Sequence, residues 1–150
     1  MRTIKICKSD EELYCEIHRN LEMSAASTTA VVKKVEDKHL MTALTEVVMK
    51  SGELLEKTEE LMSERGLIAK DISKMKQLSV DAGIMMNTMF DSSDSHIAEM
   101  MVKGLEMGVV SLRKMLKENP PRDEALAKLC TDVVELETTC AHTIGKFVKQ

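Results

Sequence analysis

Three side chains that can bind a metal ion recur near the start of the chain. Cys15, His18 and Glu22 are three and four residues apart, so a helix would place them on one side. Cys130, far along the chain, is expected to lie at a similar depth in the fold. Thiol, imidazole and carboxylate groups together can hold a soft transition metal ion. Packing of the same side chains at the edge of a core is the alternative explanation.

The sequence contains none of the motifs that mark common enzyme active sites. It has no Gly-rich phosphate loop, no nucleophile elbow and no Ser-His-Asp order. A Glu-x-x-His spacing occurs from Glu36 to His39, but it crosses a predicted helix break, where we expect a solvent-facing loop. The sequence therefore gives no support for hydrolase or kinase chemistry, and it leaves open whether the chain is an enzyme.

The charge pattern and the apolar pattern limit the partners. The formal net charge is -4, and acidic and basic residues are interleaved without a basic stripe, so we expect no nucleic-acid partner. No apolar run approaches the roughly 20 residues that cross a bilayer, and no secretory signal is recognised. These features predict a cytoplasmic protein with no membrane partner, in which widely spaced cysteines stay as thiols. The cysteines are Cys7, Cys15, Cys130 and Cys140.

Long helices must position these side chains. The 150 residues are 43% hydrophobic but only 2% aromatic, and they include two Pro and six Gly, a composition that favours helices over sheets. We therefore expect one all-α domain. The predicted helices span residues 10–35, 38–65, 94–118 and 122–149, and a shorter or kinked crossover helix spans residues 70–90.

Local signals mark the predicted helix ends. Ser9 and Glu12 have the spacing of a capping box at the first helix. Asp37 can cap the second helix, and Gly66 follows its last turn. Pro120-Pro121 ends the helix at 94–118. Because the breaks at Asp37 and at the two prolines are short, the four long helices form two hairpins, and the sequence predicts an antiparallel four-helix bundle.

The order of these elements resembles a known family. A hairpin that ends at residues 62–66 (MSERG) is followed by a short Met-bearing crossover and then by a second hairpin that opens at residues 95–104 (SHIAEMMVKG). This layout looks like that of uncharacterised bacterial ferritin-like proteins, and the resemblance covers nearly the whole chain. It implies a ferritin-like bundle in which a long crossover joins the two hairpins.

The ferritin-like resemblance also implies where a di-iron or manganese centre would lie. Such centres take glutamates from all four helices and a Glu-x-x-His from two of them. Four glutamates fall near the middles of the long helices, 31 residues apart within each hairpin (53 minus 22 and 137 minus 106): Glu22, Glu53, Glu106 and Glu137. Three positions after Glu53 and Glu137 stand Glu56 and Cys140 rather than His, so the ligand set would be degenerate. Weaker candidate ligands are Glu56, Cys140 and His18.

Glu137 is the predicted ligand that falls on a core-facing seam of its helix. A buried carboxyl group must be paired, hydrogen-bonded, metal-bound or protonated, because an isolated buried charge is costly. In the metal interpretation, Glu137 bridges ions together with the other three glutamates. In the structural interpretation, a hydroxyl group on a facing helix is its partner. The candidate hydroxyls belong to Thr28, Ser51 and Thr58.

Small residues predict a narrow middle of the bundle. Residues 23–30 of the first helix are mostly Ala, Ser and Thr, and the helix at 94–118 contains Gly104 and Gly108. Small side chains on facing helices let two backbones approach closely. A narrow middle would leave little room for two metal ions.

Two functional hypotheses follow. The first is a non-catalytic cytoplasmic ferritin-like bundle that acts through self-association or partner binding and needs no cofactor. The second is an iron- or manganese-binding carboxylate protein with a degenerate ligand set. We expect a homodimer, because the crossover contains more apolar surface than a short segment can easily bury alone. Its apolar residues are Ile72, Met75, Met85, Met86, Met89 and Phe90.

Overall fold

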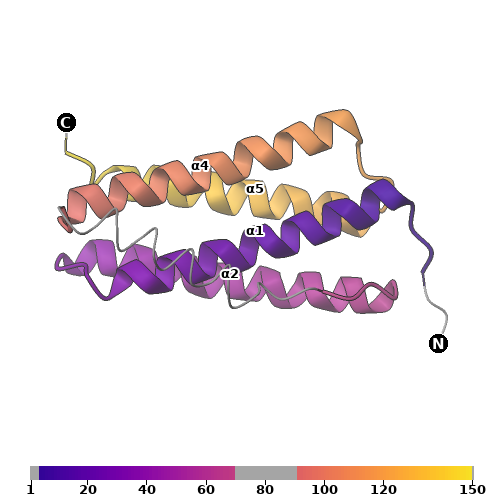
Figure 1. Cartoon of the computed structure of the whole chain (residues 1–150), viewed down its shortest axis with the longest axis horizontal. Helices are drawn as coiled ribbons and strands as arrows, with labels where there is room; N and C mark the ends of the chain where they lie inside the picture. The colour runs from indigo at the N-terminus through magenta and orange to yellow at the C-terminus, as the bar shows by residue number, and fades with distance from the viewer. Residues whose placement is uncertain (1–3, 70–90, 150) are drawn as a thin grey trace.

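The computed structural model describes residues 4–69 and 91–149. These residues form four helices and no strand: α1 (Lys8–Val32), α2 (Lys38–Glu64), α4 (Asp94–Glu118) and α5 (Glu124–Gly145). Figure 1 shows the four helices lying side by side along the long axis of the molecule. The chain is therefore all-helical in its described part, and the packing is compatible with a four-helix bundle. The predicted crossover helix at 70–90, with the apolar residues of the expected dimer contact, lies outside the described residues.

Two of the predicted helix ends are confirmed in detail. The Asp37 carboxylate accepts hydrogen bonds from the backbone N–H groups of His39 and Leu40 at 2.8 and 3.0 Å, which satisfies donors that the first turn of α2 cannot pair internally. Gly66 has a φ of 69°, in the left-handed region that side chains disfavour. That backbone turn lets the Leu67 N–H donate to the Met62 carbonyl at 2.9 Å and ends α2.

The predicted capping box at the start of α1 is wrong. The helix begins at Lys8, its N-cap is Cys7 without a side-chain cap, and Ser9 lies inside the first turn. The nearby Asp10 carboxylate is buried and accepts hydrogen bonds from the backbone N–H groups of Arg122 and Asp123, at 3.2 and 2.9 Å. These contacts fix the start of α1 from outside the helix. The helix also stops at Val32, earlier than predicted, because the chain turns at residues 33–34.

The last helix is shorter than the predicted span of 122–149. Asp123 is its N-cap and accepts a hydrogen bond from the Ala125 N–H at 3.1 Å, so helical geometry begins only at Glu124. At the other end α5 stops at Gly145, and residues 146–148 form turns. The boundaries of α4, in contrast, match the predicted 94–118.

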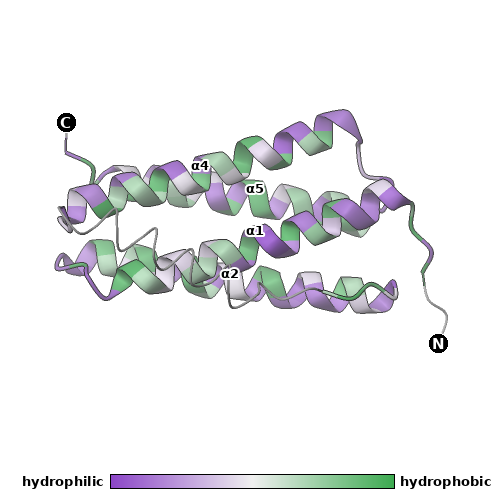
Figure 2. Ribbon diagram, in the orientation of Figure 1, coloured by the Kyte–Doolittle hydropathy of each residue, from purple (hydrophilic) through white to green (hydrophobic). Residues whose placement is uncertain are grey.

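The buried core is divided into two apolar clusters along the helices. One contains residues such as Val31, Leu44 and Ile144. The other contains residues such as Tyr14 and Leu126. Buried polar residues lie between these two clusters in sequence: Thr28 of α1, Ser51 and Thr58 of α2, and Glu137 of α5. Figure 2 shows that each helix contains hydrophilic residues as well as hydrophobic ones. None of the four described helices is long and apolar enough to cross a membrane.

Hydrogen bonds show which helix ends meet. At one end, Asp10 of α1 accepts from the backbone that precedes α5, and Arg65 after α2 pairs with Asp123. At the other end, the Asp94 carboxylate of α4 accepts from the backbone N–H of Asp37, in the α1–α2 turn, at 2.8 Å. Ser95 near the start of α4 accepts from the Lys149 N–H beyond α5, at 2.8 Å. Polar contacts therefore join neighbouring helices at both ends.

Candidate functional site

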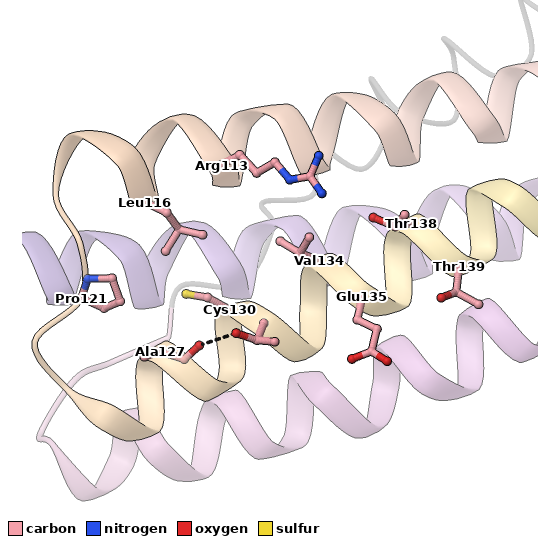
Figure 3. Close-up of a pocket in the computed structure, with 10 residues that line it drawn as sticks. Arg113, Leu116, Pro121, Ala127, Cys130, Val134, Glu135, Thr138 and Thr139 are labelled. Atoms are coloured by element: carbon pink, nitrogen blue, oxygen red, sulfur yellow. Dashed lines mark hydrogen bonds between the residues drawn. The ribbon is translucent and has the colours of Figure 1, made fainter.

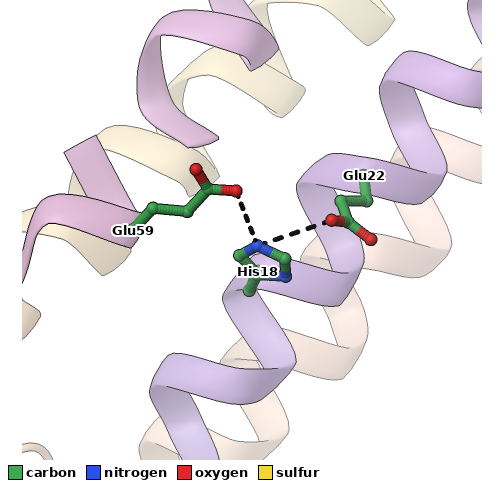
Figure 4. A group of neighbouring side chains, drawn as sticks. All are labelled: His18, Glu22 and Glu59. Atoms are coloured by element: carbon green, nitrogen blue, oxygen red, sulfur yellow. Dashed lines mark hydrogen bonds and ion pairs between the residues drawn. The ribbon is translucent and has the colours of Figure 1, made fainter. Parts of the chain in front are cut away.

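A buried histidine and two glutamates form a compact group between α1 and α2. His18 Nε2 lies 3.0 Å from Glu59 Oε1 and 3.5 Å from Glu22 Oε1. One ligand atom from each residue lies within 4.8 Å of the other two. Figure 4 shows the imidazole directed at both carboxylates, with His18 and Glu22 on one helix and Glu59 on the other.

The two helices position this group by simple periodicity. Glu22 follows His18 by four residues, so both project from the same face of α1. Glu59 approaches from α2, where it lies on the exposed side of the helix. The His18 side chain is only 2% exposed, whereas the Glu59 side chain is 50% exposed. The group therefore combines a buried imidazole, that of His18, with a solvent-exposed carboxylate, that of Glu59.

The sequence identified two members of this group but not the third. Glu59 was missed because it is one of several exposed glutamates on α2, and an exposed glutamate by itself carries no signal. Counting from the turn does not pair the two residues either, because His18 lies 14 residues before the end of α1 (32 minus 18) and Glu59 lies 21 residues after the start of α2 (59 minus 38).

The two cysteines that were predicted to accompany His18 and Glu22 lie elsewhere. Cys15 is exposed on α1, and Cys130 is buried in an apolar cluster. Burial raises the pKa of the Cys130 thiol to about 12, so at neutral pH it stays a thiol rather than the thiolate that binds metals.

The four glutamates of the predicted di-metal centre do not share one site among the described residues. Glu53 and Glu106 are exposed on α2 and α4, whereas Glu137 is 3% exposed. Glu22 joins the His18 group. Of the weaker candidates, Glu56 is exposed on α2, and Cys140 is buried on α5, where burial raises its pKa. Glu53 and Glu56 are exposed because they lie on the charged face of α2, away from the residues that pack inward.

Glu137 is buried as predicted, but its partner is a residue that the sequence did not suggest. The Asn20 side chain of α1 forms a hydrogen bond with the Glu137 carboxyl group. Burial, opposed by this hydrogen bond, raises the pKa of Glu137 to about 7. Two of the three predicted donors are used within their own helices: Thr28 donates to the Ser24 carbonyl at 2.6 Å, and Thr58 donates to the Leu54 carbonyl at 2.7 Å.

Gly108 of α4 closes the space beside Glu137. A Cβ atom at Gly108 would lie 2.7 Å from Glu137 Oε2 and 2.8 Å from Asn20 Nδ2, closer than real Cβ atoms approach other atoms. At Gly104, one turn earlier, a Cβ would meet nothing within 4 Å. The predicted close approach is therefore present at Gly108 and absent at Gly104. Three helices meet at this point, which we call the Glu137 centre: Asn20 of α1, Gly108 of α4 and Glu137 of α5.

A second buried polar group ties the ends of three helices together. The Tyr14 hydroxyl of α1 donates to Asp123 Oδ2 at 2.8 Å. The Arg65 guanidinium, after α2, donates to both oxygens of the same carboxylate and lies 5.5 Å from the centre of the Tyr14 ring. Burial alone would raise the pKa of Asp123, but hydrogen bonds from Arg65 and Tyr14 outweigh it and lower that pKa. The same burial and hydrogen bond raise the pKa of Tyr14. All members are paired, which is typical of a structural network.

A groove of about 560 Å³ follows the outer side of α4 and α5. Arg113 and Leu116 of α4 line one side, and Val134 and Thr138 of α5 line the other (Figure 3). Cys130 lies at the same groove. Its lining combines apolar and polar side chains without a cluster of ligand or catalytic groups.

Neither protein-family models nor curated proteins give a match to this chain. Function must therefore be inferred from the side chains themselves. Of the three polar groups described here, the His18 group combines an imidazole and two carboxylates at the spacing of metal ligands with access to solvent. It is the arrangement with the most definite chemistry.

Proposed function

We propose that this chain is a non-catalytic, ferritin-like antiparallel bundle that binds one divalent transition metal ion through His18, Glu22 and Glu59. The observation on which this rests is the convergence of His18 Nε2 and the two carboxylates, with all three ligand atoms within 4.8 Å of one another. The proposal keeps the metal-binding hypothesis but replaces the di-metal ligand set with a single-ion site. The meetings of helix ends at Asp10, Asp37 and Ser95 support the antiparallel arrangement.

The ligand chemistry favours zinc, iron(II), manganese(II) or cobalt(II). One imidazole nitrogen and two carboxylate oxygens suit first-row divalent ions, whereas calcium and magnesium prefer ligands that are all oxygen. Three protein ligands leave further positions for water, as in an open site. Protons compete with the ion for the imidazole and the carboxylates, so the affinity should fall as the pH falls.

Metal titration of the purified chain tests this proposal. Isothermal titration with Zn²⁺ and visible spectroscopy with Co²⁺ should give one ion per chain for the wild type. Glu59→Gln should weaken binding by about 100-fold or more, because the amide that replaces the carboxylate is a poor ligand for these ions. Glu59 is exposed at one edge of the group, so this change should leave folding intact.

A matched variant distinguishes the site from surface charge. Glu56→Gln removes an exposed carboxylate one turn earlier on α2 and should leave the affinity unchanged. His18→Ala should also abolish binding, with circular dichroism to check that the helices persist. Equal effects of Glu56→Gln and Glu59→Gln, or no binding by the wild type at micromolar ion, would reject the proposed site.

Self-association is a second candidate function, and one surface favours it. Met107 and Val110 of α4 are 72% and 66% exposed, although large apolar side chains are normally buried. They follow Gly104 by three and six residues, so all three lie near one face of α4. A second copy could approach closely there, because a Cβ at Gly104 would meet nothing within 4 Å. The proposed dimer contact is therefore this face of α4, whereas the sequence predicted a contact through the crossover at residues 70–90.

Light scattering tests the second candidate. The wild type should have the mass of a dimer, and the double substitution Met107→Glu and Val110→Glu should shift it to the mass of a monomer. Met49→Glu is the control, because Met49 is 61% exposed but lies on α2. A wild-type monomer at high concentration, or the same loss of dimer in the control, would contradict this assignment.

A further inference from the structure

The surroundings of Glu137 offer few hydrogen-bond donors to an ionised carboxylate. Its Oε1 atom is buried without a hydrogen-bond partner among the described residues, as are Asn20 Oδ1 and Ser24 Oγ. The donor provided by the neighbouring helices is the Asn20 side-chain amide. An ionised carboxylate normally needs several donors when it is removed from water. The surroundings therefore suit the neutral carboxylic acid.

No charged group faces Glu137 closely enough to compensate for ionisation within the described part of the chain. From α1 it meets Asn20, and from α4 it meets the backbone at Gly108. On its own helix, Cys140 is one turn away and stays a thiol because burial raises its pKa. From α2, the charged groups that act on this thiol are Lys50 and Glu46, which pair with each other at 3.0 Å at the surface. Among the described residues around Glu137, no positive charge is therefore placed to form a salt bridge with its ionised carboxylate.

Helix α4 packs directly against the Glu137 carboxyl group, so a change in the hydration of this group affects the packing of α4. The missing side chain at Gly108 is what makes room for Glu137 Oε2, since a Cβ there would lie 2.7 Å away. Because Gly108 packs directly beside Glu137 Oε2, a movement of α4 off α1 and α5 at this point would expose that oxygen to water. Neighbouring apolar residues hold α4 in place on both sides, through Leu105 in one cluster and Leu112 in the other.

We propose that the Glu137 centre is a proton-operated latch, which holds the middle of α4 against α1 and α5 while the carboxyl group is neutral and releases it when the group ionises. The Glu137 centre shares no residue with the proposed metal ligands, although its Asn20 lies on α1 between His18 and Glu22, and the latch needs no bound metal. The driving force is hydration: the anion gains water only if the space beside Gly108 opens.

The direction of the pH effect follows from the two states of the carboxyl group. We call the arrangement in which α4 packs against Glu137 the closed state. In this state burial raises the pKa of Glu137 to about 7, whereas a hydrated Glu has a pKa of about 4.3. The closed state is therefore most favoured below the ordinary pKa, and the preference is lost as the pH rises through the closed-state value. Between these limits the opening equilibrium should rise about tenfold per pH unit.

Hydrogen exchange of the α4 amides near Gly108, corrected for the intrinsic pH dependence of exchange, tests the latch. In the wild type, the protection should fall by about 80-fold between pH 5 and pH 8. In Glu137→Gln, which cannot ionise, protection should be independent of pH. Glu135→Gln, a substitution of an exposed residue on the same helix, should behave like the wild type.

A direct titration gives a second, independent measurement. The carboxyl carbon signal of Glu137, assigned from its loss in Glu137→Gln, should titrate near pH 7 rather than near the ordinary value. The latch is excluded if this signal titrates like an exposed glutamate. It is equally excluded if Glu137→Gln and the wild type lose α4 protection in parallel as the pH rises.

Discussion

Asp123→Ala is expected to lower the free energy of unfolding by about 3–5 kcal/mol at pH 7, because it leaves a buried guanidinium without its counter-charge. Arg65 is buried, and both oxygens of Asp123 accept hydrogen bonds from it. The same carboxylate accepts from the Tyr14 hydroxyl and caps α5. One substitution therefore removes contacts to α1, α2 and α5 together. Chemical denaturation, followed by circular dichroism, measures the loss.

The control for this prediction is a carboxylate of the same helix in an exposed pair. Asp132 pairs with Lys128 four residues away at 3.1 Å, and Asp132→Ala should cost at most about 0.5 kcal/mol. Equal costs for the two substitutions would show that the buried network does not stabilise the fold.

The cost of Asp123→Ala should also depend on pH. The pKa of Asp123 is lowered in the folded state, because hydrogen bonds from Arg65 and Tyr14 outweigh the effect of burial. A carboxylate with a lowered pKa stabilises the fold above the ordinary pKa of Asp, about 4, and this contribution is lost as the pH falls through the folded-state value. The difference between the wild type and Asp123→Ala should therefore narrow in acid. A difference that stays constant down to about pH 2 would contradict the assigned direction.

Gly108→Ala and Gly104→Ala are expected to change stability in opposite directions, by a difference of about 1–3 kcal/mol. Alanine favours helix over glycine, which should make Gly104→Ala stabilising by up to about 1 kcal/mol, because nothing lies within 4 Å of its new methyl group. At Gly108 the methyl group would lie 2.7 Å from Glu137 Oε2 and 2.8 Å from Asn20 Nδ2. Crowding in a packed interior costs about 1–3 kcal/mol and should outweigh the helix preference.

Thermal and denaturant unfolding of the two alanine variants measure this difference, and a double-mutant cycle assigns its cause. In a Glu137→Ala background the contact with Oε2 is removed and the contact with Asn20 Nδ2 stays, so part of the cost of Gly108→Ala should disappear. If Gly108→Ala stabilises the protein as much as Gly104→Ala does, then α4 does not approach α1 and α5 as closely as described.

The features that the sequence alone determined depend on local chemistry. Asp37 caps α2 because its carboxylate reaches N–H groups two and three residues ahead, and Gly66 ends that helix through its own backbone freedom. Burial of Glu137 was also predictable, because the 3.6-residue period fixes which face of a helix carries the apolar residues. Such signals act within one helix and need no knowledge of its neighbours.

The features that only the tertiary structure decided depend on how one helix is rotated and shifted against another. Asp10 was expected within a helix start and is instead an acceptor for the backbone before α5. The partner of Glu137 is Asn20 rather than a threonine, and the partner of His18 is Glu59 rather than a cysteine. A rotation of one residue turns a helix by about 100°, and a shift of one turn moves a side chain by about 5 Å. Either change moves a side chain farther than a hydrogen bond reaches. Periodicity can therefore place a residue on the inner face of its helix, but it cannot predict which residue of a neighbouring helix it meets there.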